Sequence, residues 1–157
     1  MRFLSILTLI LVVSGYSSTA HALNDAQAFS GLAEANAIYD VRTSDKKKLQ
    51  FIFTVMRDTL REARQQNIKT HYVASMRGPT VKLLIRSSAG DLALQKRVVA
   101  LIGELNEQGV RLEACGYALN LFGLVEEDLL EGIHAVGNSL NSLVGYQAKG
   151  YALVPMN

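Results

Sequence analysis

The sequence predicts an α/β fold, with a mostly parallel sheet of five strands between two layers of helices. Short segments rich in apolar and β-branched residues alternate along the chain with longer segments whose apolar residues recur at helical spacing. Capping residues and glycines separate the two kinds of segment. Strands that alternate with helices form parallel sheets, because each helix carries the chain back across the sheet by a right-handed crossover.

The N-terminal segment has the pattern of a cleaved signal peptide. Arg2 supplies a positive charge, an apolar run covers residues 3–13, and Ala20-His21-Ala22 is a cleavage site of the A-x-A type. The apolar run is too short to favour a membrane anchor. We therefore expect a signal peptide over residues 1–22 and a periplasmic or secreted protein that does not stay attached to a membrane after cleavage.

Residues 23–36 are alanine-rich and polar, without a strong helix start signal. We expect them to form an N-terminal arm that precedes the domain. One α/β domain is predicted over residues 37–157, because no repeat or linker divides this part of the chain. Its first strand is predicted over residues 37–42, which are mostly apolar.

The following segments alternate between helix and strand. An apolar stripe at helical spacing begins at Leu49 and predicts a helix that ends near Asn67, a residue that tolerates the left-handed conformation. Residues 68–75 are predicted as the second strand, which a Gly-Pro pair ends. Because proline suits the first position of a helix, a short helix is predicted over residues 80–86.

The second half of the domain continues this alternation. Asp91 is a suitable N-cap, and an apolar stripe predicts a helix from there to Gly109. A short strand from Val110 then runs directly into a helix that Gly123 ends, with Cys115 at the junction. The remaining predictions are a strand over residues 133–136, a helix that carries Leu140, Leu143 and Val144, and a last strand over residues 151–154.

The charge balance and the missing motifs exclude several functions. The full chain has 16 Lys and Arg against 14 Asp and Glu, and the leader contributes only one of these cations. A nearly neutral domain without tryptophan does not predict binding to nucleic acid or to anionic membranes. The nucleoside phosphate loops, the serine hydrolase elbow and the C-x-x-C redox pair are absent. Beyond the leader, one cysteine and two scattered histidines do not predict a metal site, and no cofactor is expected.

Cys115 is the residue where we expect chemistry. A single cysteine in an exported protein cannot form an internal disulfide. Its position just before a helix N-terminus favours the thiolate and predicts a reactive, catalytic thiol. The alternative is a buried cysteine that serves only in packing, which is a common fate of a free thiol. The sequence alone leaves both interpretations open.

Further candidate residues follow the carboxyl ends of the predicted strands, where open parallel sheets form their binding crevices. Arg77 could pair with the Cys115 thiolate and lower its pKa, or it could lie on the surface. His71 and His134 fall inside predicted strands and are not expected to be catalytic. The candidates for binding a substrate or small anion are Arg77, Gly78, Gly116, Tyr117, Asn138 and Ser139.

Five segments, in their order and spacing, also carry a family resemblance: residues 38–41, 78–84, 109–115, 123–132 and 147–152. Over these segments the chain resembles the DsrE/DsrF-like proteins, in particular their exported branch. The resemblance implies a three-layer α/β/α domain that forms homo-oligomers, often trimers or hexamers. It also implies that Cys115 occupies the position of a cysteine that carries persulfide sulfur in cytoplasmic relatives. Exported relatives often have histidine where this chain has Arg77, which argues against a histidine-assisted mechanism.

The resemblance and the position of Cys115 together lead to a functional hypothesis. We expect an exported protein that binds or transfers sulfane sulfur through a persulfide on Cys115. If it is active, it is a sulfur carrier or resembles a sulfurtransferase, with a sulfur donor or acceptor protein as partner. The alternative is a non-enzymatic, oligomeric module that binds a small anion or another protein, in which Cys115 is structural.

Overall fold

The structure, a computed structural model, describes residues 26–87 and 91–157. The predicted signal peptide and its cleavage site lie outside the described residues. Within the described ranges, five strands form one sheet in the order β4-β3-β2-β1-β5, and each pair of neighbouring strands is parallel. The predicted α/β fold with a five-stranded parallel sheet is therefore confirmed.

Helices and strands follow one another in the predicted order. The strands are β1 (Glu34–Val41), β2 (Lys69–Met76), β3 (Arg111–Cys115), β4 (His134–Val136) and β5 (Ala152–Met156). The helices are α1 (Ala26–Phe29), α2 (Lys46–Gln65), α3 (Leu92–Glu107), α4 (Gly116–Leu121) and α5 (Ser139–Ala148), with two short 3-10 helices, η1 (Gly78–Leu83) and η2 (Glu126–Asp128).

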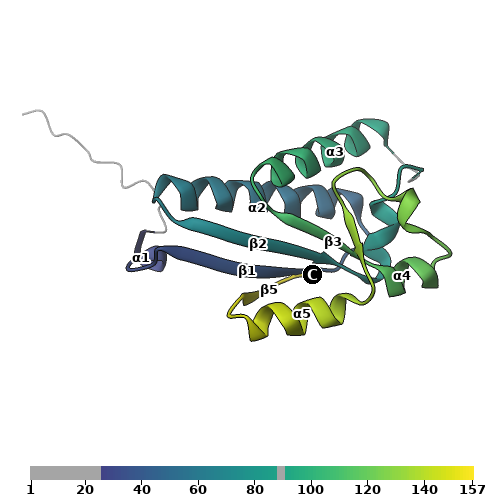
Figure 1. Ribbon diagram of the computed structural model, residues 1–157. Coiled ribbons are helices and arrows are strands. Elements are labelled where there is room, and N and C mark those ends of the chain that lie inside the picture. The colour runs from purple at the N-terminus through teal and green to yellow at the C-terminus, as the bar shows by residue number, and fades with distance from the viewer. Residues whose placement is uncertain (1–25, 88–90) are drawn as a thin grey trace, which may run out of the picture.

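The helices cover both faces of the sheet and give the domain three layers (Figure 1). α2 and α3 pack against each other on one face, and α5 packs on the other face against β1, β2, β3 and β5. α5 also carries the chain from β4, at one edge of the sheet, to β5 at the opposite edge. Over residues 26–87 and 91–157, no helix combines the length and the apolar character that a membrane span requires.

Capping residues and a buried apolar stripe stabilise α2, the longest of the described helices. Asp45 is its N-cap, and its Oδ1 accepts hydrogen bonds from the backbone N–H groups of Lys47 and Lys48 at 2.7 and 3.3 Å. Asn67, just beyond its end, adopts the left-handed conformation with φ of 60°. The predicted apolar stripe is buried in the core: Leu49, Ile52, Phe53, Met56, Leu60 and Ala63.

Two of the differences from the sequence predictions concern the start of β1 and the segment after β2. β1 begins at Glu34 rather than at residue 37, because Glu34 already pairs with Lys69 of β2. Residues 34–36 therefore belong to the sheet and not to the arm. The segment after β2 is a 3-10 helix that begins at Gly78, not a helix over residues 80–86. Gly78 adopts a positive φ of 58°, which turns the chain sharply at this point.

Candidate functional site

The segments that follow β2, β3 and β4 meet around one pocket at the carboxyl edge of the sheet. The pocket has a volume of about 320 Å³. It contains Cys115 and five of the six predicted binding residues, and only Gly116 lies outside it. Sequence reasoning missed the apolar residues of its wall. The lining residues are Arg77, Gly78, Cys115, Tyr117, Ala118, Leu121, Asn138, Ser139 and Leu140.

Cys115 is the last residue of β3 and the N-cap residue of α4. Its side chain is 5% exposed and packs with the main hydrophobic core, yet it also lines the pocket. The thiol is therefore mostly covered by protein but open to a molecule that enters the pocket.

Hydrogen-bond donors around Cys115 favour its thiolate form. Burial alone would raise the pKa of Cys115, but the Ser139 hydroxyl and the backbone N–H groups of Ser139, Ala118 and Tyr117 outweigh it, so the pKa lies below its ordinary value. Tyr117 and Ala118 belong to the first turn of α4, and Ser139 begins α5. The starts of two helices thus act on the pKa of one thiol, where the sequence predicted only the start of α4.

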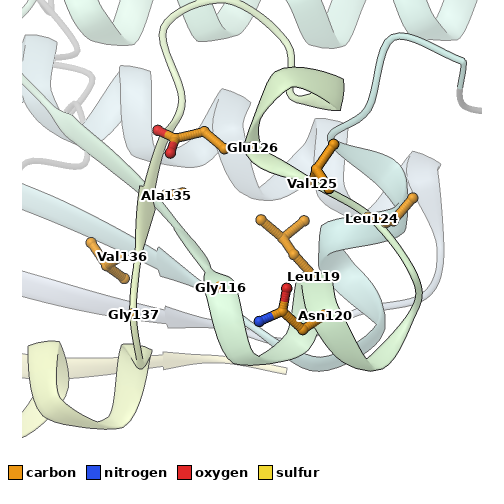
Figure 2. A pocket seen from close by; sticks show the side chains of 9 residues that line it. All are labelled: Gly116, Leu119, Asn120, Leu124, Val125, Glu126, Ala135, Val136 and Gly137. Atoms are coloured by element: carbon orange, nitrogen blue, oxygen red, sulfur yellow. The ribbon is translucent and has the colours of Figure 1, made fainter.

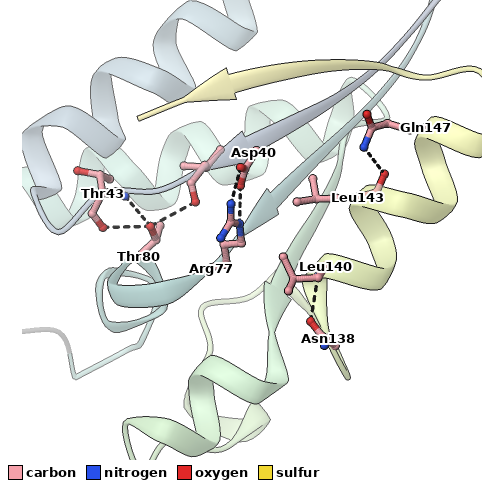
Figure 3. Close-up of polar contacts among 9 residues, drawn as sticks. Asp40, Thr43, Arg77, Thr80, Asn138, Leu140, Leu143 and Gln147 are labelled. Atoms are coloured by element: carbon pink, nitrogen blue, oxygen red, sulfur yellow. Dashed lines mark hydrogen bonds and ion pairs between the residues drawn. The ribbon is translucent and has the colours of Figure 1, made fainter.

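Ser139 presents a buried hydroxyl to this pocket. The residue is 1% exposed, and its Oγ has no hydrogen-bond partner of ordinary geometry among the described residues. Its neighbour Asn138 has a different role, because the Asn138 Oδ1 accepts a hydrogen bond from the Leu140 backbone N–H at 3.0 Å and caps α5 (Figure 3). An unpaired buried hydroxyl costs free energy, which an acceptor in the pocket would recover.

Arg77 forms an ion pair with Asp40 beside the pocket. The Arg77 Nε and Nη2 atoms donate to the two carboxylate oxygens of Asp40, each at 2.7 Å (Figure 3). The hydrogen bond to Asp40 is the largest cause of the raised pKa of Arg77; burial opposes it, and the charges of Asp40 and of the Cys115 thiolate add to it. The direct partner of Arg77 is therefore Asp40, which the sequence analysis did not identify.

Sheet register explains why Asp40 and Arg77 meet. Asp40 of β1 lies opposite Ser75 of β2, and Arg77 follows two residues after Ser75 on the same face of the sheet. Ser75 in turn lies opposite Glu113 of β3, so a buried polar row crosses the sheet beneath α5. Glu113 has its own cation, because its Oε1 accepts from the Arg111 Nε at 2.7 Å. Both buried carboxylates of this row are thus neutralised by arginines.

Gly116 has a structural role at the junction of β3 and α4. A Cβ atom on Gly116 would lie 2.8 Å from the Val136 carbonyl oxygen, so only glycine allows α4 to begin this close to β4. The Tyr117 backbone N–H donates to the Gly137 carbonyl at 3.1 Å and fixes the same contact. Gly116 lines a second pocket of about 280 Å³ between α4 and β4, which Figure 2 shows.

The remaining polar candidates lie away from the Cys115 pocket. His71 lies 3.8 Å from the Glu34 carboxylate, His134 is exposed on β4, and neither residue lines the pocket. A hydrogen bond joins the loop after β1 to η1: the Thr43 backbone N–H donates to the Thr80 Oγ1 at 2.8 Å (Figure 3). Within residues 26–87 and 91–157, no three His, Cys, Asp or Glu side chains gather as metal ligands.

The mouth of the pocket is apolar. Tyr117, Leu121 and Leu140 line it and remain 70%, 71% and 52% exposed, respectively. Val144, one turn further along α5 than Leu140, is also exposed. A thiolate-stabilising site is therefore surrounded by large apolar side chains that solvent still reaches.

The sequence matches a known protein family over most of its length. A model of the DsrE/DsrF-like family matches residues 17–156. No curated protein sequence gave a significant match.

Three solved structures share the fold. A protein of unknown function, MTH1491 from Methanobacterium thermoautotrophicum, is 21% identical, with a TM-score of 0.64 over 77% of this chain and 98% of its own. The ychN protein from E. coli is 13% identical, with a TM-score of 0.56 over 77% of this chain and 98% of its own. BT1422, a conserved protein of unknown function from Bacteroides thetaiotaomicron, is 20% identical, with a TM-score of 0.55 over 78% and 94% of the two chains. At these identities the likeness concerns the fold alone.

Proposed function

The chain belongs to the DsrE/DsrF-like family, which is related to sulfur relay, and on this premise we propose that it binds or transfers sulfane sulfur as a persulfide on Cys115. The observation that supports the proposal most is that Cys115 lines a pocket in which the Ser139 hydroxyl and nearby backbone N–H groups lower the pKa of its thiol despite burial. Such donors stabilise a thiolate before the reaction, and they would stabilise an anionic persulfide after it. The pocket offers room for the additional sulfur atom and for part of a donor.

The proposed step is a thiolate attack on sulfane sulfur. The Cys115 thiolate attacks the outer sulfur of a donor R–S–SH, the S–S bond of the donor breaks, and the thiolate R–S⁻ leaves with the electron pair. Cys115 is then a persulfide, Cys–S–SH, and the outer S–H group loses its proton in the pocket. An acceptor thiolate would remove the outer sulfur by the same step in reverse, so the cycle needs no cofactor.

Intact-mass spectrometry tests this proposal. Wild-type protein incubated with a sulfane sulfur donor should gain the mass of one sulfur atom, and a reducing thiol should remove it. The Cys115→Ser variant should gain none. A wild-type mass that stays unchanged with hydropersulfide, polysulfide and thiosulfate donors would contradict the proposal.

One observation favours the second candidate function, in which Cys115 is structural and the pocket binds a small anion or a protein. Cys115 is 5% exposed and packs among core residues. In that case alkylation of the native protein should be slow, Cys115→Ser should mainly lower stability, and ligand binding should survive the substitution. Rapid native-state alkylation would count against this candidate.

We further propose that the protein is exported and assembles as a homo-oligomer, with a sulfur donor or acceptor protein as partner. The leader pattern over residues 1–22 supports export to the periplasm or the medium. Exposed apolar side chains outside the Cys115 pocket, such as Phe51, Leu92 and Val144, support assembly. N-terminal sequencing should find Leu23 as the first residue, and light scattering should give the mass of a trimer or a hexamer.

A further inference from the structure

We infer that the Cys115 pocket selects sulfur donors with an uncharged, apolar substituent, and that Asp40 determines this selectivity by neutralising Arg77. The inference rests on the proposed function, because it names the class of donor for the same cysteine. It is carried by two independent observations, the ion pair beside the pocket and the apolar side chains at its mouth.

The first observation concerns charge. Among the described residues that line the pocket, Arg77 is the only cation, and Asp40 holds its guanidinium by two hydrogen bonds of 2.7 Å. The pair has no net charge, so it attracts an anion much less strongly than a free guanidinium would. The thiolate itself repels an anionic donor at close range. Inorganic donors such as thiosulfate therefore meet repulsion without a compensating cation.

The second observation concerns the surface that a donor must cross. Tyr117, Leu121 and Leu140 line the pocket and are more than half exposed. An apolar substituent on the donor would cover these side chains and gain free energy from the buried area. A small hydrated anion that covered these apolar side chains would gain no such free energy. The mouth therefore favours an alkyl or aryl group next to the sulfane sulfur.

Both donor classes can deliver the same sulfur atom. With benzyl hydropersulfide, the thiolate takes the outer sulfur, the S–S bond breaks and benzyl thiolate leaves with the electron pair. With thiosulfate, the thiolate takes the outer sulfur and sulfite leaves with the electron pair. The difference in rate between these donors therefore measures how strongly the pocket favours an apolar, uncharged substituent over a charged one.

The experiment has one arm that depends on sulfur transfer and one that does not. In the first arm, the rate of Cys115 persulfide formation is measured by mass with benzyl hydropersulfide and with thiosulfate. In the second arm, Cys115 is alkylated with iodoacetamide and with iodoacetate, which have similar size and differ by one negative charge. Each ratio of rates is divided by the ratio for a small uncharged model thiol. Because both reagents attack the same thiolate, the ratio does not depend on the pKa of Cys115.

We expect the corrected ratio to favour the neutral reagent by about tenfold in the wild type. Asp40→Asn removes one charge at nearly constant shape, exposes the Arg77 cation, and should shift the ratio toward the anionic reagent by a similar factor. Glu113→Gln is the matched control, since it removes another buried, arginine-paired carboxylate from the same face and should leave the ratio unchanged. Leu140→Gln should slow the benzyl donor more than iodoacetamide.

Arg77→Gln keeps the test decisive if Asp40→Asn does not fold. Without the cation, Asp40 stays unpaired near the pocket and should shift the ratio further toward the neutral reagent. Equal corrected rates for the two reagents in the wild type, or a ratio that responds equally to Asp40→Asn and Glu113→Gln, would overturn the inference. A selective alkylation ratio without persulfide formation from any donor would support the selectivity and contradict the proposed function, so the two failures are distinguishable.

Discussion

Cys115 and Ser139 each carry a group whose burial costs free energy and which the other can satisfy. The hydroxyl of Ser139 is buried and unpaired in the described part of the chain, and a buried thiolate needs donors. The nearby Ser139 hydroxyl contributes to lowering the pKa of the thiol, and the thiolate in turn offers the hydroxyl an acceptor. At the scale of single residues, this pair is the main reason to expect a reactive thiol.

Ser139→Ala should therefore raise the pKa of Cys115, because it removes a donor that favours the thiolate. The rate of iodoacetamide alkylation as a function of pH measures this value directly. Ser142→Ala, one turn further along α5, is the matched control and should leave the pKa unchanged. The same pKa in both variants would show that the Ser139 hydroxyl does not act on the sulfur.

At the scale of elements, the close approach of α4 to β4 determines where Cys115 lies. α4 begins directly after β3, and the Gly116 position leaves no room for a side chain beside the Val136 carbonyl. The capped start of α5 follows β4 by only a short turn. The contact between α4 and β4 thus brings the N–H groups of two helices to the same sulfur.

Gly116→Ala should destabilise the protein by about 1–3 kcal/mol, because the new Cβ forces backbone to move rather than a flexible side chain. Gly103→Ala in α3 is the matched control. A Cβ there meets open space within a long helix, so this substitution should stabilise by about 0.5–1 kcal/mol. Urea unfolding measures both changes, and a neutral Gly116→Ala would contradict the proposed close contact.

At the scale of the whole molecule, the titration of Cys115 links pH to stability. The pKa of Cys115 is lower in the folded state than its ordinary value, so between these two pH values the folded protein binds fewer protons than the unfolded chain. The free energy of unfolding gains a contribution as pH rises through this window. The contribution is fully present above the unfolded pKa and is lost as pH falls through the folded pKa.

The difference in stability between wild type and Cys115→Ala should therefore increase as pH rises from the lowered pKa of the folded state toward the ordinary thiol pKa of 9.0. Urea unfolding of both proteins at several pH values in this range measures it. Because all other titrating groups are the same in both proteins, their contributions cancel. A difference that stays constant over this range would mean that the folded state does not favour the thiolate.

The sequence predicted much of the site and missed the part that depends on neighbours distant along the chain. Arg77, Tyr117, Asn138 and Ser139 could be identified because each follows a predicted strand, and parallel strands end at one edge. Asp40 was not identified, because it lies within β1 and meets Arg77 only through the register of β1 and β2. An acid in an otherwise apolar strand was the one available signal.

By itself the sequence determined the alternation of strands and helices, the caps and the position of Cys115 between β3 and α4, because these depend on local spacing and on residues close in the chain. The tertiary structure decided which charges are neutralised, which donors reach the sulfur and which apolar side chains stay exposed at the pocket. These properties depend on strand order, register and the close approach of α4 to β4. Contacts of this kind join residues far apart in sequence, and no local pattern specifies them.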